Sequence, residues 1–392
     1  METDISTEHT HEGLINSLMA TGALRSTRIA NAFRCVLRQH FLPATPLSQV
    51  YVDQAVVTHT DPQGNASTSS SSQPSVMAAM LEQLNIESGT RVLEIGTGTG
   101  YNAALMAELA ARPNNVWTLE LEEKICSEAR NNLRSAGYPD VNVLCCNGWQ
   151  GYAPAALYDR IIVTCGSPSV APAWFDQLEE QGILVMPWNV MGKHQIGITL
   201  RKDMDRLTLL SSMPIGFMPL RNGESRTTPL IDNNGLRWYS PSLEPEDIDL
   251  LSSLMTQKQW RQPVPIFDAL LTARPTCLHD LEFFLDIEEE RAVTIIQQIS
   301  PTELQGQFGI ADPATHSLCL FDPNTPAGLI GWGGKEAAAL LECCMQRWLD
   351  LGQPSPSQLH LALFPPGSQD IGKKSAYGSP MDALTYCASW RR

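Results

Sequence analysis

The spacing of apolar residues divides the first part of the chain into a helical stretch and a longer region where strands and helices alternate. Between residues 12 and 42 apolar side chains recur at helical spacing, which predicts two short helices, the second capped by Ser26. From Gly89 onward, short apolar runs alternate with amphipathic ones and end in two strand-like runs on either side of "DMD". Strands separated by helices of this length predict a doubly wound, mostly parallel α/β sheet with an antiparallel edge.

The pattern changes in the segment 221–247, which is rich in turn-forming residues and predicts a junction between domains. Beyond it, helical spacing at 245–259, 278–299 and 335–350, with strand-like runs such as "HSLCLF" between them, predicts a smaller C-terminal α/β domain. A chain of 392 residues is long enough for two domains. The predicted units are an N-terminal helical segment on the substrate side at 1–75, a cofactor-binding core at 76–222, a linker at 223–243 and an accessory domain at 244–392.

Composition and charge narrow the class of protein. The net charge of −15 argues against a nucleic-acid partner, because an acidic surface repels a phosphate backbone. No apolar run is long enough to cross a bilayer and the acidic N-terminus is unlike a secretory signal, so a cytoplasmic protein with no membrane partner is predicted. None of the ten cysteines lies in a CxxC pair or a zinc spacing, and His9 and His11 have no third ligand nearby, so no metal site is predicted.

The stretch "EIGTGTG", from Glu94 to Gly100, joins a predicted strand to a predicted helix. Glycines let the backbone approach a ligand there, and the helix N-terminus offers free N–H groups. Glu120 ends the next strand, where a carboxylate can hold both hydroxyls of a ribose, so a nucleoside-type cofactor is predicted. The spacing ExGxGxG favours S-adenosylmethionine over a nicotinamide dinucleotide, whose loop has the pattern GxGxxG. The predicted cofactor-binding residues are Glu94, Gly96, Thr97, Gly98, Gly100, Glu120, Leu121, Asn147 and Gly148, the last two on the adenine side.

A run of serines, "TSSSSQPS" at 68–75, has two interpretations. Poly-serine is typical of a flexible linker. Here, however, the run continues without a break into "VMAAMLEQL", whose spacing predicts a helix. The residues alone leave open whether the run is a hinge or supplies a hydroxyl group to a site.

Several segments together resemble the protein-L-isoaspartate O-methyltransferase family. Within residues 12–222 they are "RQHFLP", "VYVDQA", "SSQPSVMAAML", "VLEIGTGTGYNAALMAEL", "YDRIIVT", "GILVMPW" and "GFMPLRN". The resemblance implies a Rossmann-like class I methyltransferase fold with a seven-stranded sheet, S-adenosylmethionine as cofactor and a protein or peptide substrate. It also implies that Ser72 is the catalytic serine beside the reacting carboxylate, which replaces the linker interpretation. Ser70, Ser71 and Gln73 are then expected on the substrate side, although a merely polar loop stays open for the two serines.

The chemistry that this resemblance implies requires few side chains. An aspartyl carboxylate has a pKa of about 4 and is ionised at neutral pH, so no general base is required. The sulfonium methyl is already activated, so no covalent nucleophile is required either. Positioning the carboxylate and excluding water can supply about 7–11 kcal/mol. The methyl ester then closes to a succinimide, which opens to aspartate and isoaspartate.

Three departures from the family pattern favour a peptide-tailoring variant. Ser71 stands where the family has isoleucine, Asn147 stands where it has aspartate, and an additional domain follows the core. These features resemble a C-terminally extended subgroup associated with ribosomally made, post-translationally modified peptides of the lanthipeptide or graspetide type, which esterifies an aspartate of a macrocyclic precursor peptide. Housekeeping repair of isoaspartate is the alternative. Two further alternatives are a binding protein without turnover and an RNA adenine methyltransferase, the latter disfavoured by the acidity.

Overall fold

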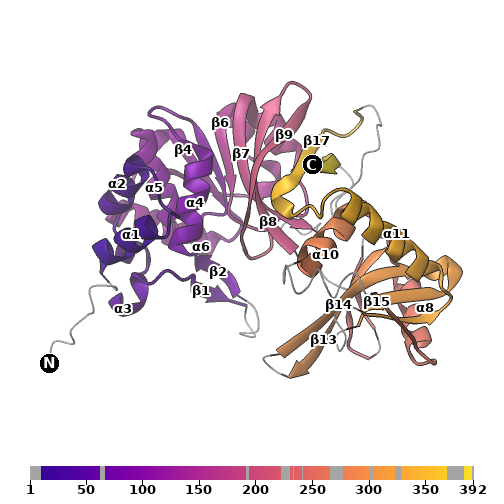
Figure 1. Ribbon diagram of the computed structural model, residues 1–392. Coiled ribbons are helices and arrows are strands. Elements are labelled where there is room, and N and C mark those ends of the chain that lie inside the picture. The colour runs from indigo at the N-terminus through magenta and orange to yellow at the C-terminus, as the bar shows by residue number, and fades with distance from the viewer. Residues whose placement is uncertain are drawn as a thin grey trace.

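Two large β-sheets organise the protein. The computed structural model describes residues 10–61, 67–190, 194–221, 230–232, 234–240, 242–264, 277–300, 303–322, 328–368 and 384–390. In this part of the chain one sheet has nine strands, another has seven, and a separate hairpin has two (Figure 1). No helix among the described residues is long and apolar enough to span a bilayer.

Two short helices open the described chain, as the apolar spacing predicts. They are α1 (His11–Ala20) and α2 (Thr27–Cys35). The Ser26 hydroxyl accepts the backbone N–H of Arg28 at 3.2 Å, which caps the start of α2. Phe33 of α2 packs edge-on against Tyr101, with 6.2 Å between ring centroids. Since Tyr101 begins helix α5 (Tyr101–Ala110), the N-terminal helices pack onto the helix that follows the glycine turn.

The first sheet contains the seven strands expected of the core. Their order is β5-β4-β3-β6-β7-β8-β9, and β5 to β7 run parallel whereas β8 and β9 are antiparallel. The predicted doubly wound sheet with an antiparallel edge is therefore confirmed. The strands are β3 (Val92–Ile95), β4 (Val116–Glu120), β5 (Asn142–Cys145), β6 (Tyr158–Val163), β7 (Leu178–Val190), β8 (His194–Asp203) and β9 (Arg206–Pro214). The helices between them are α5, α6 (Glu123–Ser135) and α7 (Pro172–Gln177), and α4 (Pro74–Leu84) precedes β3.

The end of the chain returns to this first sheet. Strand β17 (Leu359–Phe364) pairs antiparallel with β9, and β18 (Thr385–Trp390) pairs with β17, so the sheet has nine strands. The segment predicted as an accessory domain at 244–392 thus contributes to both large sheets. Residues 359–364 and 385–390 extend the core, which the predicted division at residue 244 does not foresee.

The second sheet is antiparallel throughout. Its order is β10-β11-β13-β14-β15-β16-β12. The strands are β10 (Leu230–Ile231), β11 (Arg237–Tyr239), β12 (Trp260–Pro263), β13 (Ala292–Ser300), β14 (Glu303–Asp312), β15 (Ser317–Phe321) and β16 (Gly328–Gly333), and the helices are α8 (Pro245–Met255), α10 (Cys277–Glu288) and α11 (Glu336–Asp350). The predicted linker supplies β10 and β11. The predicted helix at 278–299 is wrong beyond Glu288, because the β-branched stretch "AVTII" enters strand β13.

Alternate residues of β15 belong to two different hydrophobic cores. Leu318 and Leu320 pack in the core that includes Leu251 of α8. Cys319 and Phe321 pack in a core shared with α10, α11 and the first sheet. Because side chains alternate across a strand, α8 covers one face of the second sheet and α10 and α11 cover the other. The face covered by α10 and α11 is joined to the first sheet through one continuous core.

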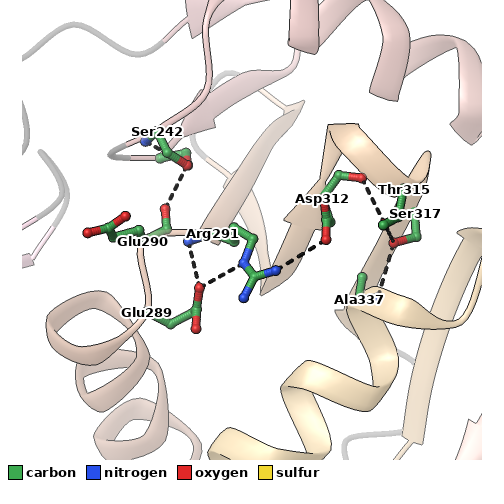
Figure 2. A network of polar contacts seen from close by, with 9 residues as sticks. Ser242, Glu289, Glu290, Arg291, Asp312, Thr315, Ser317 and Ala337 are labelled. Atoms are coloured by element: carbon green, nitrogen blue, oxygen red, sulfur yellow. Dashed lines mark hydrogen bonds and ion pairs between the residues drawn. The ribbon is translucent and has the colours of Figure 1, made fainter.

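A polar network fixes the start of α11 and the loops at one end of strands β13, β14 and β15 of the second sheet (Figure 2). Arg291 lies between Glu289, at 3.0 Å, and Asp312, at 3.2 Å. The Ser317 hydroxyl accepts the backbone N–H of Ala337 at 3.0 Å. This contact satisfies one of the free N–H groups at the start of α11 from a neighbouring strand, so the network secures the helix to the sheet.

Candidate active site

A single cleft of about 800 Å³ gathers most of the site residues predicted from sequence. Three segments line it. They are residues 67–73, here called the serine segment, residues 94–99, which belong to the glycine turn at 94–100, and residues 215–221, which follow β9. Of the predicted residues, Ser70, Ser71, Ser72, Gln73, Glu94, Gly96, Thr97, Gly98, Glu120, Leu121 and Gly148 line the cleft. Gly100 caps the start of α5 behind it, with a φ of 86°.

The serine segment lies directly over the glycine turn. Residues Ser67–Ser71 form strand β2, which pairs antiparallel with β1 (Val56–Thr60). A Cβ placed on Gly98 would lie 3.1 Å from the carbonyl oxygen of Ser70, so the two segments are in contact. The serine run is therefore part of a hairpin above the glycine turn, and the linker interpretation is wrong.

Glu94 organises the glycine turn from beneath. Its carboxylate is fully buried and accepts hydrogen bonds from the Asn102 amide and the Thr118 hydroxyl, each at 2.7 Å. The Thr118 hydroxyl in turn lies 2.7 Å from that of Thr97 in the turn. Burial raises the pKa of Glu94 to about 7, although both hydrogen bonds act in the opposite direction. Glu94 thus holds the turn in shape and is partly protonated near neutral pH.

The raised pKa makes the stability of the protein depend on pH through Glu94. The unfolded chain releases this proton near 4.5 and the folded chain near 7, so the folded state binds more protons between these values. The free energy of unfolding is therefore expected to fall by about 3 kcal/mol from this group as the pH rises through that window, and to stay level above it. Glu94→Gln should remove this slope in urea unfolding measured from pH 4.5 to pH 7. The exposed Glu87→Gln serves as the control and should keep the slope.

Glu120 lies beside the glycine turn, as expected for a ribose-binding carboxylate. One oxygen accepts the backbone N–H of Gly98 at 3.1 Å and the other accepts that of Leu121 at 2.9 Å. Leu121 is 45% exposed and lies at the rim of the cleft. This arrangement places the Glu120 carboxylate at the position predicted for a ribose-binding group, between the glycine turn and the rim of the cleft.

Of the two residues predicted on the adenine side, Gly148 lines the cleft and Asn147 does not. A Cβ on Gly148 would meet Ile95 Cγ2 at 2.5 Å, so only glycine allows this close approach to β3. The Asn147 side-chain oxygen accepts the backbone N–H of Trp149 at 3.0 Å and caps the short helical turn Gly148–Gln150. Asn147 does not line the cleft in the described residues, and its contact with adenine stays a prediction.

The fully buried Arg38, which the sequence patterns did not single out, holds the serine segment in place. Its guanidinium donates to the carbonyl oxygens of Val50 at 2.9 Å, Gln54 at 3.1 Å and Ser72 at 3.0 Å. It thereby ties the chain before β1 to the end of β2. Planar guanidinium groups suit this task because their donors point in several fixed directions.

Asp53 has a similar role at the start of α4. Its carboxylate accepts the side-chain amide of Gln73 at 3.2 Å and the backbone N–H of Ser75 at 2.8 Å. The Gln73 amide is therefore engaged within the protein, although its residue lines the cleft. Arg38 and Asp53 lie in "RQHFLP" and "VYVDQA", two segments that carry the family resemblance, and this was the only sequence signal for them.

The segment 215–221 closes the third side of the cleft. The Gln195 side chain donates to the carbonyl of Phe217 at 3.0 Å and also accepts its N–H. Arg221 donates to the carbonyl of Thr68 at 3.1 Å and forms an ion pair with Glu122. Arg221 thus connects the serine segment to the loop that follows Glu120.

Cys165 also lines the cleft. Burial raises the pKa of this thiol to about 12, so it is neutral near pH 7. A neutral thiol is a poor nucleophile. Among the described residues lining the cleft, positioning groups therefore predominate over groups suited to covalent catalysis.

Comparison with known sequences relates the chain to a family of enzymes. The family model described as protein-L-isoaspartate(D-aspartate) O-methyltransferase matches residues 9–225. A protein-L-isoaspartate O-methyltransferase of Ignicoccus hospitalis is 35% identical over 207 residues, covering 53% of this chain and 95% of that protein. Another, of Methanopyrus kandleri, is 38% identical over 228 residues, covering 58% of this chain and 93% of that protein.

Comparison with solved structures extends the similarity to the rest of the chain. A solved protein-L-isoaspartate O-methyltransferase has a TM-score of 0.54 and 26% identity, and the match covers 97% of this chain and 99% of that one. A solved structure from Plasmodium falciparum, in complex with S-adenosyl-L-homocysteine, has a TM-score of 0.47 and 20% identity over 54% of this chain and 99% of that one. The region after the core thus has a counterpart in the first of these structures.

Proposed function

Because the chain belongs to the protein-L-isoaspartate O-methyltransferase family, whose members use S-adenosylmethionine, we propose that it methylates the carboxylate of isoaspartyl residues in proteins. The observation that carries the proposal is the placement of the serine segment over the glycine turn within one cleft. A cofactor held on the turn and a carboxylate held by the serine segment would then face each other. The succinimide formed from the ester returns part of the isoaspartate to aspartate, which is a repair cycle.

The residues of the cleft fit the cofactor. Glu120, which accepts the N–H of Gly98 in the glycine turn, would hold the ribose, and Gly148 lines the cleft without a side chain on the side predicted for adenine. The cofactor supplies an activated methyl group. Ser72 would donate one hydrogen bond that orients the carboxylate without protonating it, and Arg221 and the segment 215–221 would exclude water. The main contribution of the protein is therefore positioning.

Alanine substitutions at Ser72 and Glu120 are expected to affect different properties of the enzyme, the rate of methylation and the affinity for the cofactor product. Ser72→Ala should lower the methylation rate about 10- to 100-fold, because an orienting hydrogen bond is lost, while the affinity for S-adenosylhomocysteine stays within about twofold. Glu120→Ala should instead weaken that affinity through the lost ribose contact. Calorimetric titration and a methyl-transfer assay separate the two effects, with the exposed Ser135→Ala as control. Equal losses of cofactor affinity in both variants would contradict this division of roles.

A second candidate is the tailoring of an aspartate in a modified, macrocyclic peptide. The additional domain does not distinguish tailoring from repair, because the match to a solved protein-L-isoaspartate O-methyltransferase covers 97% of this chain. The remaining grounds are Ser71 and Asn147. Ser71 is buried with its hydroxyl 3.5 Å from the Arg38 guanidinium, which makes this wall of the cleft more polar than isoleucine would.

Paired substrates distinguish the two candidates. The protein is incubated with S-adenosylmethionine and either a linear isoaspartyl peptide or a cyclic peptide with an ordinary aspartate of the same sequence. The repair proposal expects rapid methylation of the isoaspartyl peptide alone. Methylation of the cyclic peptide alone would overturn it in favour of tailoring. Binding of S-adenosylhomocysteine without transfer to either carboxylate would favour a binding protein instead.

A further inference from the structure

Two histidines and two carboxylates meet where the first sheet contacts helix α10, away from the cleft. His194 begins β8, and the other three residues, His279, Glu282 and Asp286, lie on α10. Their spacing along the helix is three and then four positions, which places them on one face. Figure 1 shows α10 beside the end of β8. The cluster therefore joins two elements that are distant in sequence.

The distances from His194 to the two carboxylates are close to those between the ligands of one small cation. His194 Nε2 lies 3.4 Å from Glu282 Oε2 and 3.5 Å from Asp286 Oδ2. Single ligand atoms of His194, His279 and Glu282 all lie within 4.8 Å of one another. In tetrahedral zinc sites with bonds of about 2.0–2.1 Å, ligand atoms are about 3.3–3.4 Å apart. Although His194 Nε2 is buried near both carboxylates, it makes no hydrogen bond of good geometry.

Neighbouring residues orient these potential ligands. The Thr294 hydroxyl of β13 donates to Glu282 Oε1 at 2.9 Å, so the other carboxylate oxygen is directed toward His194. The His194 ring packs edge-on against Phe283, with 6.4 Å between centroids. Outer contacts of this kind, which fix the orientation of a ligand, are characteristic of metal sites in proteins.

We propose that His194, His279 and Glu282, with Asp286 beside His194, form a binding site for a divalent transition metal of the zinc type. Imidazole nitrogens together with carboxylate oxygens suit zinc, whereas magnesium and calcium prefer oxygen ligands alone. The metal would cross-link β8 to α10. His194 directly precedes Gln195, which holds Phe217 at the cleft, so the cross-link would also brace one wall of the active site.

The sequence did not indicate this site because its ligands come from two distant segments. His194 and the helix face of α10 approach each other only in the folded protein, and no zinc spacing such as CxxC is present. The prediction of no metal site rested on local spacing alone. The spacing of His279 and Glu282 along α10 indicates a metal site only once the fold has brought His194 of β8 next to them.

Calorimetric titration of the chelator-treated, full-length protein with zinc chloride tests the proposal. The unaltered protein is expected to bind zinc, and His279→Ala and Glu282→Gln are each expected to weaken a binding event at least about tenfold. Both variants should fold, because His279 is exposed and glutamine retains an oxygen that can accept from Thr294. His40→Ala, at another exposed histidine, is the matched control and should leave zinc affinity unchanged.

Thiols are the main competitors for zinc in this chain. Glu123, Cys126 and Cys145 form a second group with closely spaced ligand atoms. Cys145→Ser should leave the His279-dependent binding event intact, and cobalt(II) bound there should show ligand-field bands without thiolate charge-transfer absorption. Absence of zinc binding would overturn the proposal. So would binding that is lost in Cys145→Ser but unchanged in both His279→Ala and Glu282→Gln.

Discussion

Replacing Arg38 with methionine is expected to lower the free energy of unfolding by about 3–5 kcal/mol. Methionine fills much of the same volume but leaves the carbonyl oxygens of Val50, Gln54 and Ser72 without the guanidinium donors. Each buried polar group that loses its partner costs about 1–3 kcal/mol. Urea unfolding followed by circular dichroism measures the change.

The same substitution is expected to slow methyl transfer about 10- to 100-fold under conditions where the variant is still folded. The Ser72 carbonyl is one of the acceptors of the Arg38 guanidinium, so the end of β2 loses a constraint beside the cleft. Small displacements of a positioning residue are costly when catalysis depends on geometry. Cofactor affinity should change less than the rate, because the glycine turn is held separately by Glu94.

Two further variants separate the role of Arg38 from general effects of losing a charge. Arg112→Met, at an exposed arginine, should alter the free energy of unfolding by no more than about 0.5 kcal/mol. Arg38→Lys should give an intermediate result, because a single ammonium group cannot reach all the carbonyls that the guanidinium bonds. An Arg38→Met protein as stable and as active as the unaltered chain would contradict the assigned role.

The arrangement of the first sheet could be predicted from sequence because its parallel strands are buried on both faces. Such strands appear as short, mostly apolar runs, as in "VLEI" of β3 (Val92–Ile95) and "IIV" at the end of β6 (Tyr158–Val163). The same patterns are less informative for the rest of the chain. In "AVTIIQQIS" the apolar spacing permits a helix, yet the β-branched side chains pair in β13. The pairing of β17 with β9 depends on contacts between distant residues, which no local pattern encodes.

The parts of the candidate site that could be predicted from sequence are those where the proposed function requires a particular backbone conformation. The glycine turn and Glu120 have a recognisable spacing because the ligand must approach the main chain. Arg38 has no such spacing, since its role is to satisfy carbonyl groups that only the folded chain brings together. Asn147 illustrates a different limit, because the sequence does not show that its side-chain oxygen accepts the backbone N–H of Trp149 in its own turn.

Gly96→Ala is expected to weaken the binding of S-adenosylhomocysteine at least about 100-fold, equivalent to about 2.7 kcal/mol. Gly96 has a φ of 102°, and a Cβ there would lie 2.5 Å from Thr164 Oγ1 and 2.8 Å from Cys165 Sγ. The Thr164 hydroxyl cannot simply turn away, because it donates to the Gly96 carbonyl at 2.7 Å. The turn must therefore shift, and its shape is what the cofactor requires. Calorimetric titration measures the loss.

Steric conflict and backbone strain at Gly96 can be distinguished experimentally. Gly137 has a φ of 91°, and a Cβ there would meet nothing within 4 Å, so Gly137→Ala reproduces the strain without the conflict. It should cost about 1 kcal/mol of stability and leave cofactor affinity unchanged. Combining Gly96→Ala with Thr164→Ala and Cys165→Ala removes the atoms in conflict and should restore part of the affinity. If the triple variant binds no better than Gly96→Ala, the close packing against Thr164 and Cys165 is not the reason that this position requires glycine.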